Sequence, residues 1–108
     1  MNRKGKVSFE DHYCGIIEET DNGYQFSYSP DYLNDPLAKA ISKTLPLAKG
    51  VYNSNTMFPF FDGLIPEGWL LDIAQKHWKI DIRDRMGLLL VCCKDCIGAV
   101  SIEPITKE

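Results

Sequence analysis

An Asn-Gly pair between two strand-like runs constrains the fold of this chain more than any other feature of its sequence. The pair is Asn22-Gly23, and it separates Ile16–Thr20 from Tyr24–Tyr28. Asn and Gly tolerate the positive φ angles of tight turns, so the two runs are predicted to pair as an antiparallel hairpin. In the second run three aromatic residues alternate with polar ones, which places the rings on one face of the sheet. We expect that face to line the hydrophobic core.

Other segments are expected to complete the sheet. Lys6–Phe9 and Ile97–Ile102 have the composition and alternation of strands, and Pro104 ends the second of them because proline cannot donate to a strand ladder. Pro36–Leu47 is ambiguous between a helical turn and an extended segment. Val51–Thr56 is predicted to be a polar turn.

Two helices are expected in the second half of the chain. Pro66 favours a helix start, because a residue in the first turn has no intrahelical partner for its N–H. Asp81 and Asp84 predict the start of a second helix over Met86–Cys93. The whole chain, residues 1–108, is therefore predicted to be one α+β domain: a small antiparallel sheet with helices packed on one side.

Composition excludes several function classes. Of the 108 residues, 44% are hydrophobic, which is enough to bury a core without disulfides. The net charge is -3 and the longest basic stretch is Arg3–Lys6, so direct binding to nucleic acid is not expected. No run approaches the roughly 20 apolar residues of a membrane helix, and no signal peptide is apparent. We expect a cytoplasmic protein without a membrane partner.

The cysteines allow a metal or thiol hypothesis. Cys93 and Cys96 have C-x-x-C spacing, but a structural zinc site needs a second pair of ligands, and Cys14, Cys92 and the histidines lie at irregular separations. We expect reduced thiols that pack as small hydrophobic groups, and neither a metal nor another cofactor.

No catalytic motif is present. The glycine-rich loop and catalytic aspartates of a kinase are absent, and the histidines, His12 and His77, lie in unrelated elements. Asp62 and Glu67 could form a carboxylate pair, but a turn or cap role for Asp62 and a first-turn role for Glu67 are the simpler interpretation. The sequence does not predict an enzyme.

Two blocks of the sequence resemble the N-terminal subdomain of the HipA toxin kinases. The first contains an F-F-x-x-L-L-P-E-G segment, matched here by Phe60, Phe61, Leu64, Pro66, Glu67 and Gly68, with Ile65 for the second leucine. The second is a D-x-x-G-A-V strand followed by proline, matched by Asp95, Gly98, Ala99, Val100 and Pro104. The early hairpin and ISKTLPL follow the same order, although Ile41-Ser42-Lys43 departs slightly from the usual pattern.

The kinase body of that family is not part of this sequence, so the chain resembles the free-standing HipS form of the subdomain. That resemblance implies an antitoxin that binds a HipT-like kinase and suppresses its phosphorylation of an aminoacyl-tRNA synthetase. A HipB-like DNA-binding protein is a possible third member of the complex.

The apolar segment between residues 58 and 74 is where we expect the partner to bind. Its inward-facing core residues are predicted to be Phe58, Phe60, Leu64, Leu70 and Ile73. Trp69 and Phe61 are predicted to project as interface anchors near the nucleotide or substrate cleft of the kinase. The expected partner-binding residues are Phe61, Asp62, Gly63, Ile65, Pro66, Glu67, Gly68 and Trp69.

Two alternatives stay open at this point. The chain could be a structural subunit that completes the kinase fold, or bridges the kinase to a DNA-binding protein, without lowering the kinase rate. It could also be a small thiol or metal-binding protein that uses Cys93 and Cys96.

Overall fold

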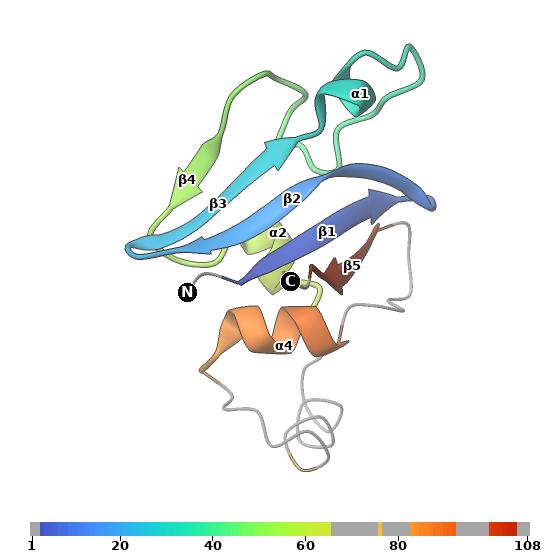
Figure 1. Cartoon of the computed structure of the whole chain (residues 1–108). Helices are drawn as coiled ribbons and strands as arrows, with labels where there is room; N and C mark the ends of the chain where they lie inside the picture. The colour runs from blue at the N-terminus through green and yellow to red at the C-terminus, as the bar shows by residue number, and fades with distance from the viewer. Residues whose placement is uncertain (1–2, 66–75, 77–82, 93–99, 106–108) are drawn as a thin grey trace.

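A five-stranded antiparallel sheet forms the centre of the computed structural model, which describes residues 3–65, 76, 83–92 and 100–105 (Figure 1). The strand order is β4-β3-β2-β1-β5. In chain order, the strands are β1 (Lys4–Phe9), β2 (His12–Thr20), β3 (Gly23–Tyr28), β4 (Tyr52–Ser54) and β5 (Val100–Pro104). The first three strands are consecutive hairpins, whereas β5 returns from the far end of the chain to pair with β1.

The hairpin at the Asn-Gly pair is confirmed. Thr20 pairs with Gly23, so Asp21 and Asn22 form a two-residue loop between β2 and β3. Gly23 takes a φ of 155°, and a Cβ atom at this position would lie 2.1 Å from the carbonyl oxygen of Ser54. Glycine is therefore required here both by its backbone conformation and by the close approach of the β4 strand end.

The turn between β1 and β2 is made without glycine. Glu10 and Asp11 both have positive φ, 50° and 69°, between the paired residues Phe9 and His12. This is the pattern of a type I′ hairpin turn, in which Asn and Gly are the usual residues. The strain of placing an acidic residue at each position is offset by the long β1–β2 pairing that the turn connects.

Three helices are described: α1 (Pro30–Leu33), α2 (Pro59–Asp62) and α4 (Arg85–Cys92). α2 packs against β3, where the ring centroids of Phe26 and Phe61 are 5.4 Å apart. α4 packs against β1, because a Cβ on Gly5 would lie 2.8 Å from a methyl carbon of Leu90. Both helices contact the core face of the sheet, which confirms the predicted α+β fold.

Alternation along the strands divides the sheet into a core face and an outer face. The core face carries side chains that are fully buried, such as Val7, Ile17, Phe26 and Ile102. The outer face pairs opposite charges across strands, with Lys4 opposite Glu18 and Lys6 opposite Glu103. The three rings of β3 lie on the core side, where Phe26 and Tyr28 are buried and Tyr24 packs at the margin. The core face predicted from the aromatic alternation is therefore confirmed.

Other expectations need correction or lie outside the described residues. Val51–Thr56, predicted as a turn, contains β4. This strand is only three residues long and has no alternation of apolar residues from which the sequence could have predicted it. Pro36–Leu47 has neither helix nor strand beyond a single bridge between Ser42 and Leu45. The helix start at Pro66 and the residues 77–82 and 93–99 fall outside the description.

In the described part of the chain, no helix has both the length and the apolar character needed to cross a membrane.

Candidate functional site

The candidate site begins at α2, the short helix in the middle of the apolar segment. Pro59 occupies the first helical turn, where its missing N–H costs no hydrogen bond. The amide of Asp62 donates to the carbonyl oxygen of Phe58 at 2.8 Å, and that of Gly63 donates to Pro59 at 3.0 Å. The backbone N–H groups of Leu64 and Ile65 make the next two hydrogen bonds, to the carbonyl oxygens of Phe61 and Asp62. The Phe-Pro-Phe-Phe sequence therefore forms one compact turn of helix rather than an open loop.

This helical turn decides which aromatic rings face the core. Phe58 and Phe61 are three residues apart and both are buried, as is Ile65. Phe61 is 0% exposed and makes ring contacts with Phe26, Phe58 and Phe60. The expectation that Phe61 projects outward as an anchor is therefore wrong, and Ile65 is likewise a core residue.

The inward side chains predicted for the segment are partly correct. Phe58 is buried as expected. Phe60 and Leu64 are only partly buried and pack against the margin of the core. The physical reason is the 3.6-residue period of the helical turn, which places Phe61 rather than Phe60 on the same side as Phe58. Leu70 and Ile73 lie outside the described residues.

Asp62 and Gly63 are the predicted partner-binding residues that the structure places at the surface. Gly63 is exposed, and the Asp62 side chain is 43% exposed. An Asp62 oxygen accepts a hydrogen bond from Nε of Arg85 in α4 at 2.7 Å. Pro66, Glu67, Gly68 and Trp69 lie outside the described residues. Asp62 thus links α2 to α4 through Arg85, and a pairing of Asp62 with Glu67 involves a residue outside the description.

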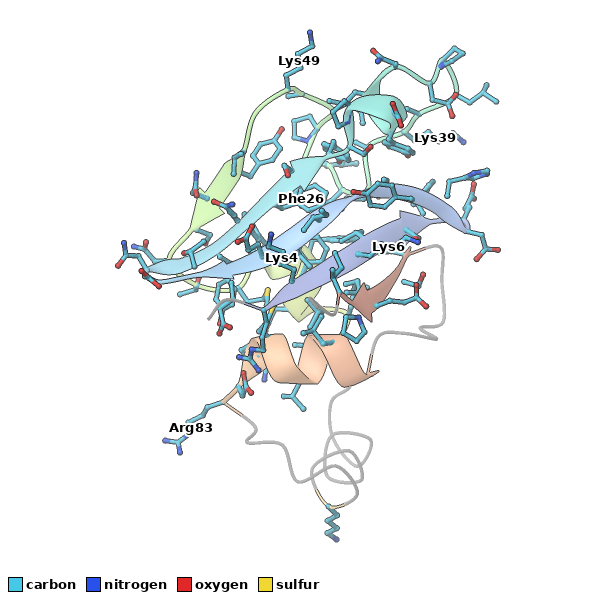
Figure 2. The ribbon with its side chains drawn as sticks, viewed as in Figure 1. Lys4, Lys6, Phe26, Lys39, Lys49 and Arg83 are labelled. Atoms are coloured by element: carbon cyan, nitrogen blue, oxygen red, sulfur yellow. The ribbon has the colours of Figure 1, made fainter. Side chains whose placement is uncertain are left out.

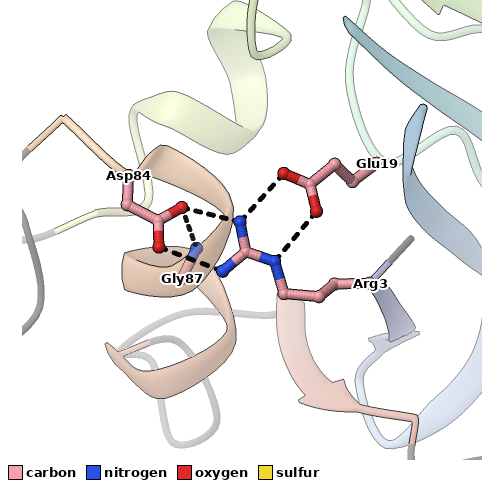
Figure 3. Close-up of polar contacts among 4 residues, drawn as sticks. All are labelled: Arg3, Glu19, Asp84 and Gly87. Carbon is pink, nitrogen blue, oxygen red and sulfur yellow. Dashed lines mark hydrogen bonds and ion pairs between the residues drawn. The ribbon is translucent and has the colours of Figure 1, made fainter. Parts of the chain in front are cut away.

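A second ion-pair cluster joins α4 to the N-terminal part of the sheet (Figure 3). The Arg3 guanidinium donates two hydrogen bonds to Glu19, at 2.9 and 2.8 Å, and two to Asp84, at 3.0 and 2.8 Å. Asp84 also accepts the backbone N–H of Gly87 at 3.1 Å, so it is the N-cap of α4. The prediction that an acidic residue starts this helix is confirmed at Asp84. Such planar, bidentate contacts are specific to arginine.

Both ion-pair links end at the start of α4, at Asp84 and Arg85. In the sequence, residues 66–82, which include the predicted binding residues Pro66–Trp69, lie between α2 and α4. Asp62–Arg85 connects the two flanking helices directly, and Arg3–Asp84 fixes the start of α4. The two helices that flank this stretch in the sequence are therefore joined by an ion pair, and α4 is also joined to the N-terminal part of the chain.

The Arg3 cluster changes the titration of both carboxyl groups. Hydrogen bonds from Arg3 lower the pKa of Glu19 and the pKa of Asp84 below their ordinary values. A carboxylate with a lowered pKa in the folded state contributes stability above its unfolded pKa, and this contribution is lost as the pH falls through the folded value. The cluster is therefore expected to stabilise the fold at neutral pH and to fail in acid.

Replacing Arg3 by glutamine should reveal this pH dependence. At pH 7 we expect R3Q to lower the free energy of unfolding by about 1 kcal/mol, since the cluster is partly exposed to solvent. The difference between the two proteins should shrink as the pH falls below about 4, where Glu19 and Asp84 become protonated in the unfolded chain. Urea unfolding followed by circular dichroism at a series of pH values measures it.

The matched control for R3Q is Lys4→Gln, which removes one positive charge from the next residue of the chain. Lys4 faces Glu18 across the strand pair and belongs to the outer face. A K4Q variant with the same pH profile as R3Q would mean that net charge, and not the Arg3 cluster, causes the effect.

Reactive groups elsewhere in the described residues do not assemble into a catalytic arrangement. Cys14 is fully buried in β2, and burial raises the pKa of its thiol to about 12, so it stays protonated and packs as a small hydrophobic group. His12 is exposed at the start of β2. Within the described ranges, no three His, Cys, Asp or Glu side chains come together as a metal site. Cys93, Cys96 and His77 are not among the described residues.

Comparison with known proteins adds a family assignment to this geometry. Residues 5–103 match the model of the HipA N-terminal domain family. An uncharacterized protein of Haemophilus influenzae is 38% identical over 101 residues, which is 94% of this chain and 92% of the relative. A solved structure, the N-terminal domain of HipA toxin, superposes with a TM-score of 0.69 at 30% identity, covering 98% of this chain and 95% of the other.

Proposed function

Because the chain belongs to the HipA N-terminal domain family, we propose that it is an antitoxin that binds and inhibits a HipT-type Ser/Thr kinase by direct contact. The observation that carries the proposal is the family match over residues 5–103, almost the full sequence given. Both the relative and the solved structure are likewise covered over more than nine-tenths of their lengths. A domain of this kind is well suited to pack against a kinase body.

The chemistry of the described residues supports binding rather than catalysis. The partly exposed carboxylates of Glu19, Asp62 and Asp84 are engaged by arginine, and the thiol of Cys14 is buried and protonated. None of these groups is free to act as a nucleophile or a general base within the part of the chain that the structure describes. We propose a protein without catalytic activity of its own.

The proposed kinase-binding surface contains Asp62, Gly63 and the adjoining Pro66–Trp69. Asp62 and Gly63 lie at the surface beside a rigid base formed by Phe61 and Ile65. Trp69 follows this base closely in the sequence and supplies a large, rigid ring of the kind that dominates protein interfaces.

A kinase assay with purified components tests the proposal. The kinase encoded beside this protein is incubated with its substrate and ATP, with and without this chain at equimolar and higher concentrations. We expect phosphate transfer to fall with a stoichiometric end point, and the complex to elute as one species in size-exclusion chromatography. The experiment is then repeated with the HipB-like DNA-binding protein to find whether a ternary complex forms.

Two results would contradict inhibition. Binding without a lower kinase rate would favour the structural-subunit alternative. No binding to the neighbouring kinase at micromolar concentration, while the protein is folded by circular dichroism, would remove the proposal. The thiol alternative has a direct test of its own, a native thiol titration with elemental analysis for zinc.

A further inference from the structure

The loop between α1 and β4 exposes an unusual combination of side chains. Five large hydrophobic residues stand out as exposed among the described residues, and three of them, Leu37, Leu47 and Val51, lie here. The loop contains three lysines, and Asp35 at its start is its one acidic residue, although the whole chain has a net charge of -3. Exposed apolar side chains that gather in one segment and are rimmed by polar residues mark a candidate docking surface.

Three tyrosine hydroxyl groups hold this loop in place. The Tyr28 hydroxyl accepts the N–H of Ile41 at 3.1 Å and donates to the carbonyl oxygen of Leu45. The Tyr32 hydroxyl accepts the N–H of Lys39 and donates to its carbonyl oxygen, at 3.0 and 2.6 Å. These bonds satisfy backbone N–H and C=O groups of a segment that has no helix or strand partners for them.

Buried anchors complete the fixation of the loop. Ile41 and Leu45 are 7% and 2% exposed, and the hydroxyl of Tyr52 donates to the carbonyl oxygen of Pro46 at 2.6 Å. The rings of Tyr28 and Tyr32 are stacked, with their centroids 6.0 Å apart. The exposed residues of the loop are therefore displayed in one arrangement, which reduces the entropy that a partner must remove on binding.

A groove of about 360 Å³ lies between α1 and this loop. It is lined by Tyr28, Pro30, Leu33, Asn34, Lys49 and Gly50. The lining is mainly apolar, and Lys49 is its one charged member. Leu47 and Val51 flank Lys49 in the sequence and are both exposed. The groove thus offers an apolar pocket with a cation at its rim.

We propose that this groove and the surrounding loop form a second docking surface, for an acidic protein segment that inserts one bulky apolar side chain. The apolar side chain would contact Tyr28, Pro30 and Leu33, and a flanking carboxylate would pair with Lys49. Exposed Lys39 and Lys43 extend the positive charge along the same loop. This proposal does not depend on whether the chain inhibits a kinase.

Charge and geometry favour a protein segment over the other possible occupants. Asp31 and Asp35 lie beside the groove, and Asp35 is occupied in accepting the N–H of Leu37 at 2.9 Å. A polyanion such as nucleic acid needs a denser row of cations than three lysines beside two aspartates. A short acidic motif with one apolar residue needs only the single cation at the groove and the apolar pocket.

Among the described elements, this surface lies away from α4, the helix that contacts Asp62 through Arg85. Figure 1 shows α1 and the loop beyond one end of the sheet, away from α4 on the opposite side. Lys39 and Lys49 project at this same end in Figure 2, far from Arg83, which lies two residues before α4. A partner at this loop would therefore leave α4 uncovered.

The test uses a random-peptide display library selected against the full-length protein. We expect the enriched peptides to share an apolar residue flanked by Asp or Glu, and a labelled synthetic copy to shift the amide resonances of residues 30–51 in NMR spectra. Lys49→Glu should weaken the labelled peptide about tenfold or more, as measured by fluorescence anisotropy. Lys6→Glu, the same change of charge on the outer face of the sheet, should leave binding unchanged.

Several outcomes would overturn the proposal. Enriched peptides without acidic residues, or resonance shifts confined to α2 and α4, would show that the groove is not the site. If K6E and K49E weakened peptide binding equally at unchanged melting temperature, the effect would come from net charge and not from the groove. Tighter binding to anionic vesicles or to a single-stranded oligonucleotide, or a K49E-sensitive self-association in sedimentation, would assign the surface to a different occupant.

Discussion

Replacing Phe61 by alanine is expected to lower the free energy of unfolding by about 3–5 kcal/mol, the range for removing a buried aromatic ring from a core. The ring is 0% exposed and contacts Phe26 on the sheet as well as Phe58 and Phe60. Its removal leaves a cavity between α2 and β3 that the surrounding side chains can fill only in part. Urea or thermal unfolding followed by circular dichroism measures the loss.

Phe60→Ala is the matched control for Phe61→Ala. The two residues are neighbours in the same helix, but Phe60 is only partly buried and packs at the margin of the core. We expect a loss smaller than that of F61A by about 1 kcal/mol or more. Equal losses for the two variants would contradict the burial seen in the structure.

The Phe61 variant also separates stability from binding. At a temperature where F61A remains folded, it should still bind the kinase with close to normal affinity, because Phe61 faces the core and not the partner. A loss of affinity in folded F61A would instead restore Phe61 to the interface.

Replacing Trp69 by alanine is expected to produce the largest loss of kinase binding. If Trp69 is the anchor of the proposed interface, the W69A variant should bind at least about 2 kcal/mol more weakly, which is roughly a 30-fold higher Kd. The kinase assay should show a matching loss of inhibition. Isothermal titration calorimetry gives the affinity, and the melting temperature shows whether the fold is retained.

Trp78→Ala is the control for this experiment, because it removes the chain's other tryptophan from a position outside the proposed binding residues. We expect W78A to inhibit the kinase normally at a temperature where it is folded. A large fall in melting temperature for W69A together with normal binding would assign Trp69 to the core. Normal binding and normal stability together would leave the proposed interface without its anchor.

The sequence by itself predicted the elements that depend on local chemistry. The Asn22-Gly23 hairpin and the aromatic alternation of β3 follow from turn preferences and the two-residue period of a strand. The acidic cap of α4 at Asp84 follows from the need to satisfy free N–H groups in the first helical turn. Each of these features is fixed by residues that are close together in the chain, so the sequence pattern is sufficient.

Other features depend on contacts between distant segments, which no local pattern reveals. Strand β4 forms because Tyr52–Ser54 pair with the edge of β3, and the role of Arg3 requires Glu19 and Asp84 to come together. The sequence-based prediction that Phe61 lies at the surface is wrong. The run of phenylalanines at residues 58–61 does not show which ring the α2 turn directs toward Phe26.

The sequence alone therefore determined that this chain forms a small antiparallel sheet that contains the Asn22-Gly23 hairpin. It also determined which family the chain resembles. The tertiary structure alone decided which described side chains of the apolar segment are buried and which ion pairs join α4 to α2 and to Arg3. It also decided which loop exposes its apolar residues. The reason is physical: turns and caps are short-range interactions, whereas burial and ion pairing depend on where the folded chain brings distant residues into contact.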